Sequence, residues 1–101
     1  MPTTPATQSE LFTLLVDSNA QAMRDLLVPE GFTPYGPNLQ HDTTGVMVAV
    51  GADGYRITFV SAGTCGQLGV VDLPPSTGYT AVRDTALALH RFVAAEIEAA
   101  G

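Results

Sequence analysis

The feature that most constrains the fold is a pair of β-forming segments on either side of Asp53-Gly54. Residues 46–50 and 55–60 are rich in β-branched and aromatic residues. Glycine tolerates the positive φ of a tight turn, so the pattern predicts an antiparallel hairpin with Asp53-Gly54 as a two-residue loop, or with a four-residue loop that keeps the same side-chain sets together. Strand side chains alternate between two faces. The face that we expect to be the core carries Val46, Val48, Val50, Tyr55, Ile57 and Phe59.

Further strands are predicted on both sides of this hairpin. Residues 67–73 follow a glycine-rich link and are stopped by Pro74-Pro75, which indicates a third strand. Residues 29–42 contain three prolines, which cannot donate to a strand ladder, so we expect at most a ragged edge strand at residues 38–41.

Two helices are predicted to flank the strands. Thr7 and Glu10 fit a capping box, and the first helix is expected to end near Pro29 and Gly31. Three- and four-residue spacings indicate its apolar stripe: Leu11, Leu14, Leu15, Ser18, Ala22 and Leu26. A similar stripe indicates a C-terminal helix: Val82, Ala86, Leu89, Phe92, Val93 and Ile97.

Together these elements predict an α+β fold in the order α-β-β-β-α. Two helices would pack on one face of an antiparallel sheet of three or four strands. Residues 1–6 are expected to form a flexible tail and residues 7–101 a single domain, because a chain of 101 residues has room for one core.

The reverse face of the predicted sheet is unusually apolar. If Asp72 points away from the core, strand alternation gives this face seven residues: Met47, Ala49, Arg56, Thr58, Val60, Leu68 and Val70. An antiparallel sheet covered on one side normally shows polar residues on the other. We therefore expect a cover, which could be residues 32–42, a second copy of the chain or a different protein.

The candidate catalytic groups are few. Cys65 is a candidate reactive thiol, but a nucleophilic cysteine needs a base or cation nearby, and the sequence does not place His41 or His90 beside it. His41-Asp42 is poorly arranged as a general base, because neighbouring residues in an extended segment point to opposite sides. His90 is interpreted as a helix-surface histidine. We expect no cofactor and no metal site, and no small-molecule ligand.

The charge balance limits the partners. Ten acidic residues stand against four arginines, with no lysine, for a net charge of −6. This balance argues against nucleic-acid binding, which relies on clustered cations. No secretory signal and no apolar run long enough to span a membrane are visible, so we expect a cytoplasmic protein without membrane contact. The lysine-free composition is typical of a high-GC bacterium or its phage.

These observations lead to three hypotheses about function. The first is a non-catalytic protein-interaction module that self-associates, as a homodimer, through the reverse face. The second is an acidic inhibitor or immunity-type protein that blocks a basic site on a toxin, nuclease or defence enzyme, although its acids are scattered along the sequence. The third is a small enzyme or ligand carrier that uses Cys65.

Overall fold

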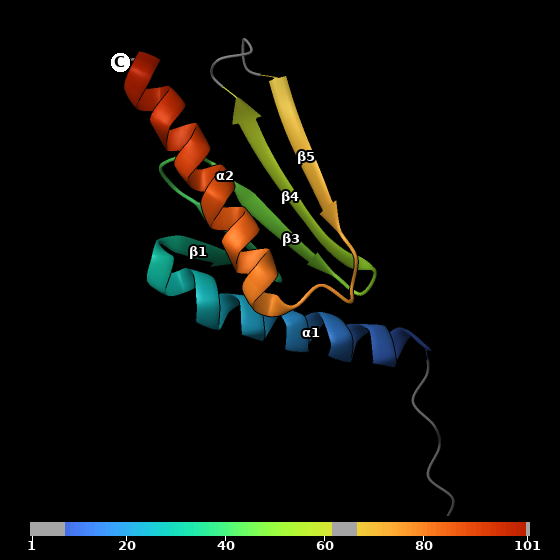
Figure 1. Ribbon diagram of the computed structural model, residues 1–101. Helices are drawn as coiled ribbons and strands as arrows, with labels where there is room; N and C mark the ends of the chain where they lie inside the picture. The colour runs from blue at the N-terminus through green and yellow to red at the C-terminus, as the bar shows by residue number, and fades with distance from the viewer. Residues whose placement is uncertain (1–7, 62–66, 101) are drawn as a thin grey trace, which may run out of the picture.

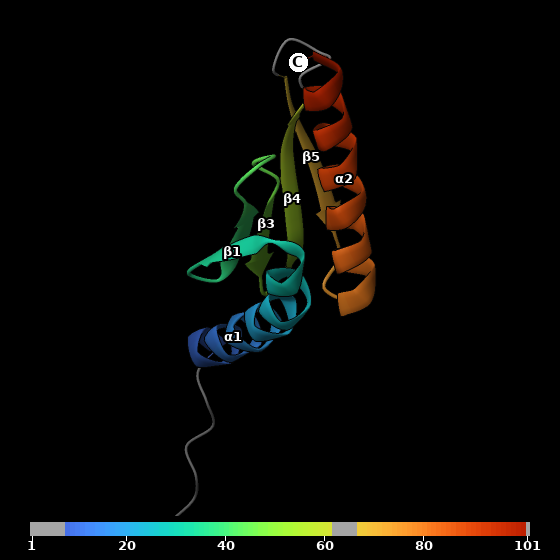
Figure 2. The same ribbon diagram turned by 90° about the vertical axis from the view of Figure 1, so that its left-hand side faces the viewer.

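The structure, a computed structural model, describes residues 8–61 and 67–100. The predicted tail at residues 1–6 and Cys65 both lie outside these residues. The described residues form two long helices on one face of a five-stranded sheet (Figures 1 and 2). The elements are α1 (Gln8–Leu27), the short 3-10 helix η1 (Val28–Glu30), β1 (Phe32–Tyr35), β2 (Asn38–His41), β3 (Met47–Gly51), β4 (Gly54–Ser61), β5 (Gln67–Leu73) and α2 (Tyr79–Ala100).

The α+β class and the antiparallel sheet are confirmed, but the predicted strand count and order are wrong. The five strands form a meander in the order β1-β2-β3-β4-β5, in which every neighbouring pair is antiparallel. The proline-rich segment supplies the extra strand. Pro34 lies in β1, an edge strand with a single neighbour among the described strands, so the missing backbone N–H of proline need not weaken the ladder. The segment at residues 38–41, expected at an edge, is β2 and lies between β1 and β3.

The central hairpin is confirmed with a shifted turn. Gly51 pairs with Gly54, so the two-residue loop is Ala52-Asp53, and Val50 faces Tyr55. The turn moves by one residue, so the cross-strand partner of each residue moves by two. A shift of two in the strand register leaves every side chain on its predicted face. Gly54 opens β4 with a φ of 135°, and a Cβ atom there would overlap the Leu73 carbonyl group. Glycine is therefore required because β5 ends so close to the backbone of the turn.

The core lies between one face of the sheet and both helices. α1 packs against β1, β2 and β3, whereas α2 lies mainly over β4 (Figures 1 and 2). The hairpin residues predicted to face the core are buried, except that Phe59 is only half-buried. The predicted stripe of the C-terminal helix is only partly right, because Phe92 and Ile97 are 52% and 44% exposed. The helices contribute six buried residues to this core: Ala20, Met23, Leu27, Val82, Ala86 and Val93.

The predicted apolar stripe of α1 lies on the wrong face of the helix. In its second half Ser18 is exposed, and Ala22 and Leu26 are only half-buried. Leu11, Leu14 and Leu15 are 50%, 62% and 50% exposed. Figure 1 shows that α1 crosses below the strands and that its N-terminal half extends beyond the point where α2 begins. The part of α1 that reaches the core instead uses the spacing of Ala20, Met23 and Leu27.

No helix in the described part of the chain is both long and apolar enough to cross a lipid bilayer.

Candidate functional site

The structure brings the seven predicted reverse-face residues together with Asp72. In the sheet register, Met47, Thr58 and Val70 form one row across β3, β4 and β5. Ala49, Arg56 and Asp72 form a second row, and Val60 faces Leu68 in a third. Residues directly opposite in an antiparallel ladder point to the same side. We call these eight residues the second face.

The exposed apolar part of the second face lies over β4 and β5. Val60, Leu68 and Val70 are 48%, 65% and 48% exposed, whereas Met47 and Ala49 on β3 are half-buried. Residues 32–42, which were one candidate cover, mostly form β1 and β2 and extend the sheet at its far edge. They leave the apolar surface of β4 and β5 open to solvent.

A single ion pair lies within this apolar surface. Arg56 Nε donates to Asp72 Oδ1 at 2.7 Å, and Arg56 Nη2 donates to Asp72 Oδ2 at 3.3 Å. The hydrogen bond from Arg56 lowers the pKa of Asp72, and the same bond raises the pKa of Arg56. Both side chains are about 60% exposed (62% and 63%), so solvent screens the pair and it adds little to folding stability. Its effect is to leave the second face locally neutral.

β5 gives the second face an open border. Within residues 8–61 and 67–100, β5 pairs with β4 alone, so one side of its backbone has no strand partner. The strand runs for seven residues and contains no proline and no lysine, the residues that commonly protect such an edge. On the core side, the Phe59 ring lies over Gly69, which has no side chain to hold it away.

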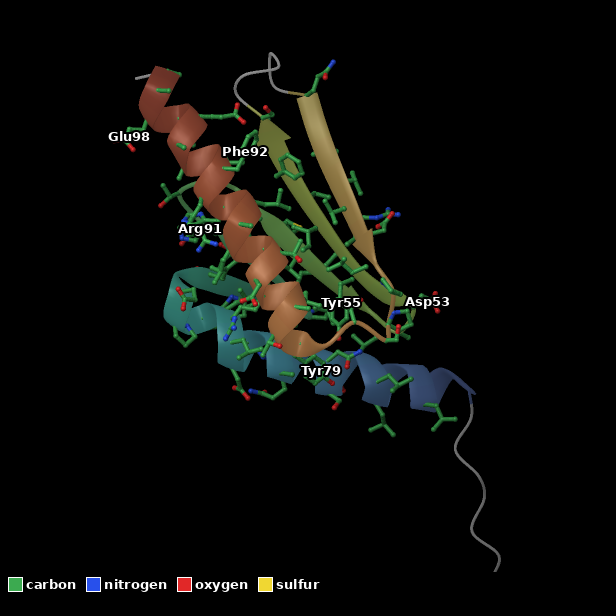
Figure 3. The ribbon with its side chains drawn as sticks, in the orientation of Figure 1. Asp53, Tyr55, Tyr79, Arg91, Phe92 and Glu98 are labelled. Atoms are coloured by element: carbon green, nitrogen blue, oxygen red, sulfur yellow. The ribbon has the colours of Figure 1, made fainter. Side chains whose placement is uncertain are left out.

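An open hollow of about 460 Å³ lies where the β3–β4 turn meets the end of β5. Figure 3 shows Asp53 at this turn, with Tyr55 beside it on β4. Burial, followed by the nearby Tyr79, raises the pKa of the Tyr55 phenol. The lining contains neither histidine nor cysteine, and its arginine is Arg56, already bonded to Asp72. The polar side chains of the lining are Asp53, Tyr55, Arg56 and Asp72, and no contact between Tyr55 and a carboxylate marks a catalytic pair among them.

The structure also assembles a cluster that the sequence analysis missed. His41, at the end of β2, stacks on His90 of α2 with ring centroids 3.8 Å apart and an interplanar angle of 28°. Phe32 presents its ring edge-on to both, at centroid distances of 5.2 and 6.3 Å. His90, interpreted as a helix-surface histidine, is half-buried at the edge of the buried side of α2. The spacing of Val82, Ala86 and His90 by four residues already placed it on the buried side of α2.

The acidic residues remain dispersed in the fold. Exposed carboxylates occur on α1, on α2, after β2, at the β3–β4 turn and on β5. Among the described residues, no three histidine, cysteine, aspartate or glutamate side chains gather in a way that could hold a metal ion. Because Cys65 lies outside the described residues, its proposed reactivity stays a prediction.

No protein-family model, curated protein or solved structure matches the chain.

Proposed function

We propose that this chain is a non-catalytic interaction module that self-associates through the second face of its sheet. The observation that supports the proposal best is the contiguous apolar surface of Val60, Leu68 and Val70 on adjacent strands, bordered by the open edge of β5. Exposed contiguous apolar patches typically mark interaction sites.

A second copy of the chain suits this surface, because the surface carries one positive and one negative group that can pair with their opposites on an identical surface. The ion pair of Arg56 and Asp72 offers one positive and one negative group. In a twofold interface the same patch meets itself, so each charge can face its opposite on the other copy. A strongly acidic or basic partner would gain nothing from a surface that is locally neutral.

The expected dimer is weak. Burial of ~400 Å² of apolar surface contributes about 10 kcal/mol, against association costs of roughly 4–15 kcal/mol. These two figures are of similar size, so the association should be reversible on dilution. The net charge of −6 on each copy opposes it further, and salt should screen that repulsion.

Sedimentation equilibrium over a range of concentrations tests the proposal with a matched pair of variants. Leu68 on the second face and Leu14 on α1 are similarly exposed, at 65% and 62%. We expect the wild-type chain to approach twice its monomer mass of 10.5 kDa at high concentration. Leu68→Asp should stay monomeric, whereas Leu14→Asp should associate as the wild type does.

Two results would contradict the proposal. One is a wild-type chain that stays monomeric at every concentration, and the other is association that survives Leu68→Asp but is lost in Leu14→Asp.

The dependence on salt distinguishes self-association through an apolar surface from charge-led binding to a basic partner. Raising the salt from about 0.05 to 0.5 M should preserve or strengthen self-association, whereas charge-led binding weakens as salt rises.

A further inference from the structure

The cluster around His41 and His90 adds a side-chain contact between α2 and the end of β2, beside the direct packing of α2 on α1. α2 lies mainly over β4, while α1 covers β1, β2 and β3. The stacked rings join α2 to the end of β2, on the core side of the sheet and away from the second face. What happens at this cluster therefore does not depend on the proposed self-association.

The hydrogen bonds of the cluster fit two neutral imidazoles. The Thr43 amide donates to His41 Nδ1 at 3.2 Å, so this nitrogen is an acceptor and the ring proton is on Nε2. Thr44 Oγ1 lies 2.9 Å from His90 Nδ1 and also accepts from the Val46 amide at 3.5 Å. A neutral His90 lets the buried Thr44 hydroxyl donate to Nδ1 while its oxygen accepts the amide.

We propose that the stacked His41 and His90 form an acid-sensitive latch, which holds α2 against the β2–β3 turn at neutral pH and loosens as the pH falls.

Protonation disrupts the cluster at both rings. A proton added to His41 must go to Nδ1, and it displaces the Thr43 amide from that nitrogen. A proton on His90 Nδ1 reverses the bond to Thr44, so that the nitrogen donates to Thr44 Oγ1 and the Thr44 hydroxyl hydrogen loses Nδ1 as its acceptor. If both rings are charged, two like charges are held 3.8 Å apart in a partly buried site, where their repulsion is strong.

Arg91 and Asp42 are the charged neighbours of the two histidines in the sequence, and Glu30 precedes Gly31, which lies against the His41 ring. Arg91 follows His90 directly in α2 (Figure 3). Asp42 accepts a hydrogen bond from Thr33 on β1 at 3.1 Å. Burial lowers the pKa of His90 from its ordinary value of 6.5, and His41 and then Arg91 lower it further.

The lowered pKa of His90 determines how the folding stability changes with pH. The unfolded chain binds a proton at His90 more readily than the folded chain does. The stability that a neutral His90 contributes is therefore fully present above pH ~6.5 and is progressively lost as the pH falls below that value. At pH 5.5 an unshifted histidine is about 90% protonated, so one site that stays neutral in the fold costs up to about tenfold in the folding equilibrium constant.

Proton NMR can follow the latch directly, because the chain has only two histidines and thus two imidazole Hε1 signals. At monomeric concentrations we expect the His90 signal to titrate below pH 6.5, together with the amide signals of residues 43–46. His41→Phe keeps a stacked ring but removes its charge, so it should raise the titration midpoint of His90. Urea unfolding at pH 7.5 and 5.5 should show a loss of stability that is reduced in His90→Phe.

The latch is contradicted if the His90 imidazole titrates at its ordinary pH of about 6.5 and His41→Phe leaves that midpoint unchanged. It is also contradicted if acid shifts the amide signals of the whole fold alike. Should His90→Phe fail to fold, the wild-type titration and His41→Phe decide the question without it. Self-association is tested separately, by the sedimentation of the Leu68→Asp variant. The latch and the self-association can therefore be refuted independently of each other.

Discussion

The contact of Phe59 with Gly69 gives a sharp test of how β4 and β5 are held together. The two residues face each other in the register, and a Cβ atom at residue 69 would overlap the Phe59 ring. Gly69→Ala should therefore force the half-buried ring away from its contacts with the core. Overpacking of this kind costs roughly 1–3 kcal/mol, while the stiffer unfolded chain returns about 0.4–1 kcal/mol. The expected net loss is about 1–2 kcal/mol.

A double-mutant cycle isolates this contact. In a Phe59→Leu background the overlapping ring is gone, so Gly69→Ala should be neutral or stabilising. Urea unfolding of the four proteins, at a concentration where the wild type is monomeric, should give a coupling energy of about 1–2.5 kcal/mol. A neutral or stabilising effect of Gly69→Ala in the wild-type background would refute the reasoning. So would a coupling energy below about 0.5 kcal/mol.

Two further predictions concern α1 and the central turn. Met23→Ala removes a fully buried side chain and should cost about 2–5 kcal/mol in urea unfolding, whereas Leu14→Ala should stay within about 0.5 kcal/mol of the wild type. Equal costs would mean that the N-terminal half of α1 is packed. Gly54→Ala should cost about 3 kcal/mol or more, because the strained φ and the overlap with the Leu73 carbonyl group add together. Gly36→Ala, at φ 60° with open space around it, should cost only about 1–2 kcal/mol, and a similar cost for both would contradict the close approach of β5.

The composition of the second face could be predicted because it depends only on strand alternation. The true turn is Ala52-Asp53 and the register differs from the expected one by two residues. A slip of two residues returns each side chain to the same side of the sheet. The grouping of Met47, Arg56 and Val70 on one face therefore survives the error in the turn.

The packing of α1 could not be predicted from its sequence, because the helix carries two apolar stripes. Leu11, Leu14 and Leu15 make the more apolar one, but the buried one runs through Ala20, Met23 and Leu27. The choice between them depends on how the helix is turned about its axis against the sheet, and this is a property of the assembled strands.

The histidine stack and β1 were missed for two different reasons. His41 and His90 belong to distant parts of the sequence, so only the fold brings their rings together. In β1, Pro34 argued against a strand, but at an edge a residue without an N–H can be tolerated.

The most direct test of the proposed function maps the interface residue by residue. Backbone amide NMR spectra of the wild-type chain should be compared during serial dilution, at constant pH and salt. The account predicts concentration-dependent shifts along β4 and β5, strongest around Val60, Leu68 and Val70, with little change in α1 or at the histidine stack. Shifts confined to Leu11, Leu14 and Leu15 of α1, or no shifts at any concentration, would contradict it.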